Sequence, residues 1–404
     1  MKSLHRRLAA FLGLSGQLLW RYRYLGLAAF LTILGLVDVV WAVHPALILG
    51  AAALAVFLSI RDLRLVARES SGIDFLLRES DEYDDVDLTG ASRLEAGSDV
   101  GLILIEESAR LRDGPAVRVR LEDVYQLHPA LEESAPLFLF RRLSKSHLWN
   151  EPALGLAGDL PTGQDLATVP LRPCDYFNFV ATNLFAQTDV VVADGSETLV
   201  GKGRRLFIDR HGKLRAFRDS WLANLIGVST LAFTSDGKLV LVRQTSHNTG
   251  SPGRYAPSGS GALDPSDLQG RNELAAIVMA GANRELCQET GVLPHEIVAE
   301  QVLAHARWLN RGGMPEFVGV SLLSVDSHEL DKRPIPTEER QFTRSRQTVR
   351  LSDTDSWSRS EPLAPLPQGA AKAASLPLAI AMRALIDAMA DDRLPIIRAL
   401  RDRL

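Results

Sequence analysis

Two long apolar runs dominate the first part of the hydrophobic pattern. Residues 25–43 are apolar apart from Thr32 and Asp38, and residues 45–60 are apolar apart from Ser59. A transmembrane helix needs about 20 predominantly apolar residues, and each run approaches that length. The pattern therefore predicts a transmembrane helical hairpin with a tight turn between its two helices.

Basic residues on both sides of this hairpin set its predicted orientation. The connecting turn has no Lys or Arg, whereas the flanks hold Lys2, Arg6, Arg7, Arg21, Arg23, Arg61, Arg64 and Arg68. By the positive-inside rule both ends face the cytoplasm. Residues 1–68 are thus predicted to anchor the chain in the lipid bilayer of a bacterial-type inner (cell) membrane, multi-pass, with both termini cytoplasmic. A buried helical hairpin in a soluble protein is the alternative. A cleaved signal peptide fits less well, because the apolar core of a signal peptide is shorter than the apolar stretch found here.

An acidic stretch follows the predicted hairpin, and a longer region of short apolar segments and turns comes after it. Residues 79–87 are mostly acidic, which predicts a solvated linker over residues 69–95 that anionic lipids would repel. Over residues 96–223, short apolar segments alternate with turns rich in Pro and Gly. This alternation predicts a mixed α/β domain, to which the sequence gives no role.

Residues 224–326 have the clearest periodicity. Residues 228–234 and 238–244 alternate apolar and polar positions on either side of Asp236-Gly237, and Asp-Gly in a two-residue loop is a strong hairpin signal. A helical segment follows and ends near Gly291, and residues 296–303 and 317–325 read as further strands. We therefore expect a mixed sheet with flanking helices.

The C-terminal part divides into a polar and an apolar stretch. Residues 327–361 are rich in Arg, Glu, Ser and Thr, which predicts a flexible segment, although its arginines could instead cluster to bind phosphate. Within the helical region 362–404, residues 376–390 predict an amphipathic helix. This helix could cover one face of the sheet.

Composition narrows the functional classes. The 404 residues carry a formal net charge of -4, so we expect no general polyanion-binding surface and no nucleic-acid partner. The chain has two cysteines, Cys174 and Cys287, which provide neither a disulfide framework nor a metal cluster and suit a reducing compartment.

The most specific motif is the segment Arg284–Val292. It resembles the second half of the Nudix box, R-E-U-x-E-E-x-G-U with U aliphatic, and departs from it at Gln288, where the family has Glu. On a helix, Glu285 and Glu289 share one face, where their oxygens can hold a hard divalent cation. Gly291 suits the left-handed residue that ends a helix.

The first half of the box is degenerate. Ala276 stands at the family's Glu position, and Gly270 falls at the Gly position but lies in what looks like a helix start. The turn at residues 255–261, Tyr-Ala-Pro-Ser-Gly-Ser-Gly, resembles the family's glycine turn better, and residues 262–272 would then be an insertion. Glu273 is a candidate for the missing carboxylate.

The resemblance implies a fold, a cofactor and a site. The implied fold is α/β, a Nudix-like α/β/α sandwich with a mixed sheet, preceded by the mixed α/β region and the membrane hairpin. Glu285, Glu289 and Gln288 would bind Mg2+ (or Mn2+), with Arg284 orienting the carboxylates. The substrate-binding candidates are Ser258, Gly259, Gly261 and Arg243, and the candidates for the base are Glu316 and Glu273.

The implied function is hydrolysis of a nucleoside diphosphate linked to another moiety, by a membrane-anchored Nudix-like pyrophosphohydrolase. A second hypothesis is a catalytically weak or inactive nucleotide-binding sensor tethered to the membrane. Ala276 and Gln288 favour the sensor, whereas the intact Glu285/Glu289 pair favours the enzyme. A third, a pore built from the hairpin, has only Asp38 in its favour. Assembly into a homo-oligomer is left open.

Overall fold

The computed structural model describes most of the chain beyond the predicted membrane anchor. The described residues are 74–79, 83–132, 135, 138, 139, 142, 150–163, 165–193, 197–246 and 251–404. The predicted spans at residues 25–43 and 45–60 lie outside them. Within the described ranges, no helix has the length and apolar character needed to cross a membrane.

The chain divides into two compact units. The first comprises residues 1–79, 132–151 and 188–203. Its described part is an antiparallel three-stranded sheet in the order β1-β7-β8, formed by β1 (Asp74–Glu79), β7 (Thr188–Ala193) and β8 (Glu197–Lys202). The candidate site lies in the second unit, which holds the remaining residues.

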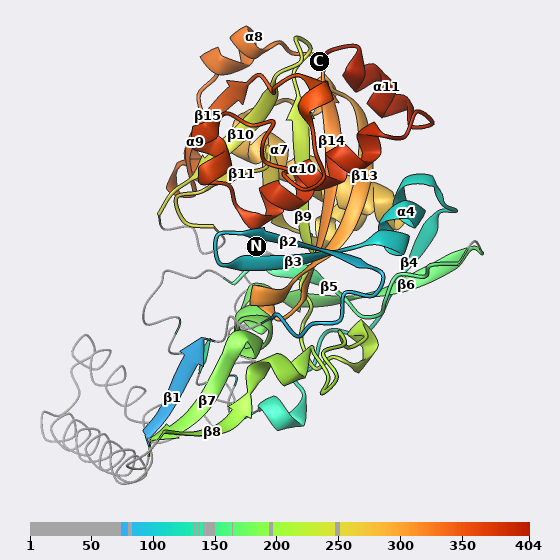
Figure 1. The fold of residues 1–404 in the computed structure, drawn as a ribbon. Helices are drawn as coiled ribbons and strands as arrows, with labels where there is room; N and C mark the ends of the chain where they lie inside the picture. The colour runs from blue at the N-terminus through green and yellow to red at the C-terminus, as the bar shows by residue number, and fades with distance from the viewer. Residues whose placement is uncertain are drawn as a thin grey trace, which may run out of the picture. The chain divides into compact units, whose positions relative to one another are not determined.

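A nine-stranded mixed sheet forms the centre of the second unit (Figure 1). Its main path is β11-β10-β9-β14-β13-β3-β2, while β12 pairs with β9 and β15 pairs with β10. The β14–β9 pair is parallel and the other pairs are antiparallel. The strands are β2 (Ala91–Ala96), β3 (Asp99–Leu104), β9 (Gly227–Phe233), β10 (Leu239–Gln244), β11 (Tyr255–Ala256), β12 (Gly259–Ala262), β13 (Ile297–Trp308), β14 (Met314–Leu323) and β15 (Thr343–Val349).

Two helices cover this sheet, α10 (Leu376–Met389) in front and α7 (Leu274–Thr290) behind (Figure 1). Gly319 of β14 lies against Met279 of α7, and Gly101 of β3 lies against Ile380 of α10. Because helices cover both faces, β14 is buried along its whole length and reads as a continuous apolar run rather than an alternation. The expected mixed α/β fold with a mixed sheet is confirmed at this level.

Smaller elements complete the second unit. A three-stranded sheet has the order β4-β6-β5, and helix α4 packs against β13. The bounds of these elements are β4 (Val117–Leu121), β5 (Pro152–Leu156), β6 (Ala167–Asp175), α4 (Ile105–Asp113), α6 (Tyr176–Phe179), a π-helix (Val180–Leu184), α8 (Ser327–Lys332), α9 (Gln368–Lys372) and α11 (Pro395–Arg401). Short 3-10 helices include η6 (Pro265–Leu268), η7 (Pro294–Glu296) and η9 (Thr337–Gln341).

The structure moves two boundaries that the sequence suggests. The predicted linker, 69–95, ends in β2, and Tyr83 and Val86 at its acidic part are buried in a core cluster. β2 and β3 also belong to the same sheet as the strands of residues 224–326. The boundary at 223 is therefore not a domain boundary, because strand pairing joins segments that are distant in sequence.

The polar stretch 327–361 also differs from the expectation of a flexible segment. It contains α8 and β15, and β15 pairs with β10 over the whole length of β10. An edge strand needs few apolar side chains, so its sequence looks like a loop. The predicted C-terminal helix is present as α10, but eleven of its fourteen residues are buried, so it is apolar on nearly every side.

Candidate functional site

The C-terminal half of α7 carries the acidic residues of the motif. The helix ends at Gly291, which has φ 73 and donates its N–H to the carbonyl of Cys287. A left-handed residue here suits glycine because it has no Cβ. Glu285 and Glu289 stand four residues apart on one face, as the spacing predicts.

Strand β12 lies directly against this face of α7. A Cβ on Gly259 would come 2.3 Å from the backbone nitrogen of Leu286, and a Cβ on Gly261 would come 2.2 Å from the carboxyl carbon of Glu285. Between them, the N–H of Ser260 donates to Oε2 of Glu289 at 2.9 Å. The glycines thus let a strand backbone approach both carboxylates, and Gly261 borders the pair.

Arg284 fixes one of the two acids. Its Nη1 donates to Oε1 of Glu285 at 2.6 Å, and its Nε and Nη2 donate to the two carboxylate oxygens of Asp267, each at 3.0 Å. Nη2 also donates to the carbonyl of Ala262 at 2.9 Å. Burial alone would lower the pKa of Arg284, but the bond to Asp267 and the charge of Glu285 raise it. The predicted insertion 262–272 therefore supplies Asp267 as an anchor for Arg284.

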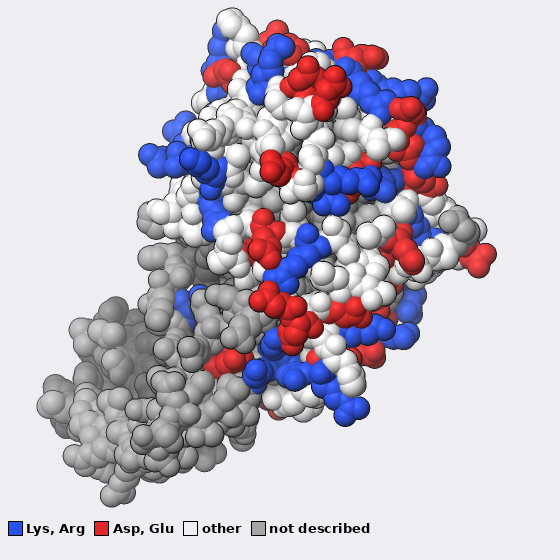
Figure 2. Space-filling model, in the orientation of Figure 1, with Lys and Arg blue, Asp and Glu red and all other residues white. Residues whose placement is uncertain are grey.

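Burial shifts the pKa of both glutamates. Elsewhere, basic and acidic side chains are interspersed over the face in Figure 2, where exposed ion pairs contribute little. Burial raises the pKa of Glu285 to about 6 despite Arg284. Burial and the charge of Glu285 raise the pKa of Glu289 well above its usual range, although the Ser260 N–H opposes this. The two carboxyl groups thus lie on one face of α7, Glu289 buried and Glu285 half-buried, and Arg284 bonds to Glu285.

A third carboxylate, from a segment distant in sequence, acts on the pair through its charge. The charge of Glu339, on η9, raises the pKa of both Glu285 and Glu289. In the described ranges, no three His, Cys, Asp or Glu side chains stand close enough to hold a metal ion by themselves. A bound cation would therefore need oxygens from water or a phosphate in addition to the two glutamates. Neither Glu339 nor Asp267 has a sequence signal, because each is brought in by tertiary structure.

The other candidates lie in different surroundings. Ser258 is fully buried, and its hydroxyl bonds to the N–H of Ala232 and the carbonyl of Val240, so it is part of the core and we do not retain it as a ligand-binding residue. Gln288 is exposed and its Oε1 accepts from Nη1 of Arg284 at 3.4 Å. Arg243 lies over the ring of Tyr255 at 5.4 Å.

Neither predicted base lies with the carboxylate pair. Ser321 of β14 faces α7, where its Oγ donates to Asn283, so Glu316, an odd number of positions away, points to the opposite face of the sheet. There Ser229 donates to Glu316 at 2.6 Å. Glu273 is the exposed N-cap of α7, about 18 Å along the helix from Glu285 at 1.5 Å per residue.

Glu316 instead predicts a pH-dependent stability. Burial raises its pKa to about 7, against an ordinary value of 4.5, although Ser229 and Arg311 oppose the shift. The folded state therefore binds this proton more tightly than the unfolded chain. The contribution of this protonated carboxyl group to the free energy of unfolding is fully present below pH 4.5 and is lost as the pH rises through 7.

We expect Glu316→Gln to remove this dependence. Between pH 5 and 8 the free energy of unfolding of the unaltered protein should fall relative to that of the variant by about 3 kcal/mol. Urea unfolding of both proteins at the two pH values measures the difference. Parallel pH profiles would show that Glu316 does not take up a proton in this range.

Comparisons with known proteins leave the family open. No protein-family model matches the chain, and no curated protein is significantly similar to it. One similar solved structure is that of DR0079 from Deinococcus radiodurans, with 19% sequence identity and a TM-score of 0.26, covering 39% of this chain and 81% of that one. A likeness of this extent adds nothing to the chemistry of the residues described above.

Proposed function

We propose that this chain is a membrane-anchored, Nudix-like pyrophosphohydrolase that acts with Mg2+ or Mn2+ on a nucleoside diphosphate linked to another moiety. One observation carries the proposal: Glu289 is buried and Glu285 half-buried on one face of α7, and among the described residues Arg284 pairs with Glu285 and not with Glu289. A buried carboxyl group such as Glu289 is stable in its charged form only beside a positive partner. A divalent cation with oxygen ligands, shared with a diphosphate, meets this requirement.

The fold is compatible with the same proposal. The layers α7, mixed sheet and α10 form an α/β/α sandwich, in which a glycine-containing strand, β12, precedes the acidic helix. This is the order of elements that the Nudix resemblance implies. The finer assignment to a Nudix-like sandwich belongs to this proposal.

Glu285 and Glu289 would hold the cation, and Arg284, fixed by Asp267, orients Glu285. When bound, the cation stabilises charge on the phosphate oxygens and lowers the pKa of a bound water. The oxygen of a water molecule attacks phosphorus, the phosphoanhydride bond breaks, and the leaving phosphate takes the bonding electrons. In this proposal Glu339, whose charge acts on both glutamates, accepts the proton from the water.

A nucleotide-binding sensor is the second candidate. It is favoured by Gln288, an uncharged residue that stands on the exposed side of α7 and bonds Arg284. With two carboxylates rather than three on the helix, the cation would be held less tightly. A sensor would bind the diphosphate without breaking it.

The membrane anchor remains a proposal from the apolar runs at residues 25–43 and 45–60. We expect the full chain to partition with membranes, with the carboxylate pair on the cytoplasmic side. Recovery of the full-length protein in the soluble fraction of a cell lysate would contradict the anchor without touching the hydrolase proposal.

The decisive experiment compares binding and cleavage in one set of compounds. The full chain, purified in detergent, is incubated with nucleoside diphosphates linked to sugars, bases or alcohols, with and without Mg2+. Magnesium-dependent release of a nucleoside monophosphate supports the hydrolase. Magnesium-dependent binding with intact ligand supports the sensor, and neither binding nor cleavage contradicts both.

A further inference from the structure

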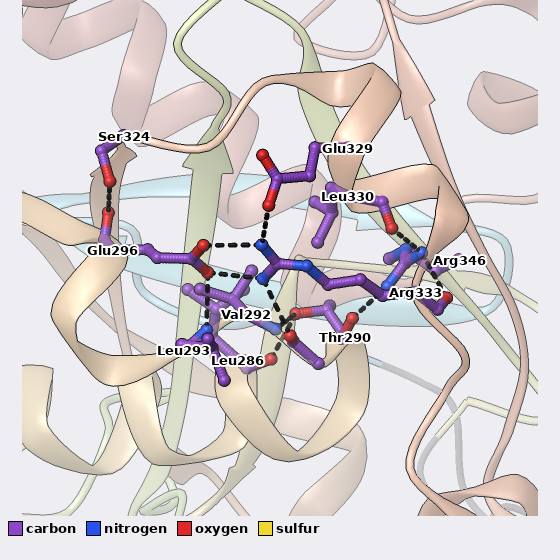
Figure 3. Close-up of polar contacts among 11 residues, drawn as sticks. Leu286, Thr290, Val292, Leu293, Glu296, Ser324, Glu329, Leu330, Arg333 and Arg346 are labelled. Carbon is purple, nitrogen blue, oxygen red and sulfur yellow. Dashed lines mark hydrogen bonds and ion pairs between the residues drawn. The ribbon is translucent and has the colours of Figure 1, made fainter.

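Two arginines meet at the C-terminal end of α7 (Figure 3). The last four carbonyls of a helix have no partner within it. Arg346, from β15, donates Nη1 to the carbonyl of Thr290, and Arg333, which follows α8, donates to the carbonyl of Gly291 at 3.4 Å. Positive charge at this end also interacts favourably with the helix dipole.

Arg346 joins three separate places in the fold. Besides Thr290, its Nη2 donates to the carbonyls of Leu330 and Arg333, the second at 2.9 Å. Its backbone pairs with Val242 in the sheet. Burial lowers the pKa of Arg346. A guanidinium with several donors in one plane can bridge carbonyls in this way, whereas a lysine ammonium cannot.

Arg333 is held in turn by acids. Its Nη1 and Nη2 donate to the two carboxylate oxygens of Glu296 at 2.6 and 2.7 Å, and Nη2 also donates to Glu329 at 2.8 Å (Figure 3). The bond to Arg333 lowers the pKa of Glu296, so the pair is charged at neutral pH. The carbonyl of Arg333, which accepts from Arg346, therefore belongs to a residue whose side chain is held by two glutamates.

The segment between the two arginines carries Glu339. It leaves Arg333, forms η9 and returns in β15 to Arg346, and the N–H of Thr245 donates to the carbonyl of Phe342 on the way. Both of its ends are therefore tied to the last turn of α7. Glu289 stands one residue before the carbonyl that Arg346 binds.

We propose that Arg346 is a positioning residue that fixes Glu289, through the last turn of α7, to the segment that carries Glu339. The relation between the two carboxylates of the candidate site is then set by one guanidinium outside it. This role rests on the proposed function. Arg346 itself touches neither carboxylate in the bonds it makes.

The test uses Arg346→Ala and Arg346→Lys in the full chain, with Arg344→Ala as the control because Arg344 is exposed on the same strand. Mn2+ affinity is measured by electron paramagnetic resonance, and amide hydrogen exchange is followed at residues 286–291. We expect Arg346→Ala to weaken Mn2+ binding by about tenfold or more and to speed exchange in that turn. Arg346→Lys should be intermediate, and Arg344→Ala should match the unaltered protein.

Kinetics separate positioning from a general loss of structure. Arg346→Ala should lower kcat more than it changes KM, and Glu339→Gln should cost less in the Arg346→Ala background than alone, since the two act through one geometry. Unchanged Mn2+ affinity and exchange in a folded Arg346→Ala protein would overturn the positioning role and leave the proposed function standing. If this variant does not fold, Arg346→Lys decides in the same way. Absence of Mn2+ binding by the unaltered protein would overturn the proposed function and the positioning role together.

Discussion

Replacing Glu289 by Gln should reduce magnesium-dependent cleavage by two orders of magnitude or more. The substitution keeps the shape of the side chain but removes one of the two carboxylate ligands that α7 offers to the cation on one face. The positive charge that would stabilise the transition state is then held less tightly, and single preorganised electrostatic contacts of this kind are worth about 10²–10³ in rate. Initial rates and Mn2+ affinity, measured on the same preparations, check the effect.

Glu273→Gln is the matched control. It makes the same change on the same helix, but at the exposed N-cap. Its rate and metal affinity should equal those of the unaltered protein. Gln288→Glu should raise metal affinity for either function, whereas only a hydrolase would show a change in cleavage. Magnesium-dependent cleavage that survives Glu289→Gln would remove the site assignment.

Gly259→Ala should cause the largest loss of stability among single methyl additions near the site. The new Cβ would lie 2.3 Å from the backbone nitrogen of Leu286 and 2.8 Å from the carbonyl oxygen of Ala282. Backbone atoms of a helix cannot turn aside as a side-chain end can, so β12 and α7 must separate. Overpacking typically costs about 1–3 kcal/mol, and we expect the upper end or more, measured as a shift of the urea midpoint.

Gly369→Ala provides the comparison for this variant. Gly369 is exposed on the short helix α9, and no atom lies within 4 Å of an added Cβ. Alanine favours helix over glycine by up to about 1 kcal/mol, so the midpoint should stay or rise. An unchanged urea midpoint for Gly259→Ala would show that β12 does not pack closely against the backbone of α7.

Local patterns predict the elements that are specified locally. The helix that ends at Gly291 follows from its spacing and its cap, and the turn at Asp236-Gly237 is present, with the N–H of Thr234 bonded to the carbonyl of Lys238. The predicted hairpin is nevertheless short, because β9 and β10 pair only at Phe233 and Leu239. β10 then pairs with β15, whose polar sequence shows no strand pattern.

The candidate site also contains residues that the sequence predicts and residues that only the structure brings together. The positions of Glu285 and Glu289 on one face are set by helical spacing, so the sequence predicts them. Asp267 and Glu339 arrive through a turn and a returning segment, which no spacing rule encodes. Residue type makes Glu316 a candidate for the base, but the side of the sheet to which it points depends on a register that only the structure gives.

The pairing of β3 with β13 has a consequence for how the chain folds. Ala306 of β13 pairs with Ile103 of β3, so the sheet closes a loop of about 200 residues, and such non-local pairing is slow. During synthesis the edge of β3 stays unpaired until β13, its partner in the sheet, has left the ribosome. A fragment that starts at residue 224 would, conversely, expose the edge of β13 and the part of α10 that packs against β2 and β3. The unit that bears the carboxylate pair therefore matures late and as a whole, and the early-made strands are the part most open to mispairing in the meantime.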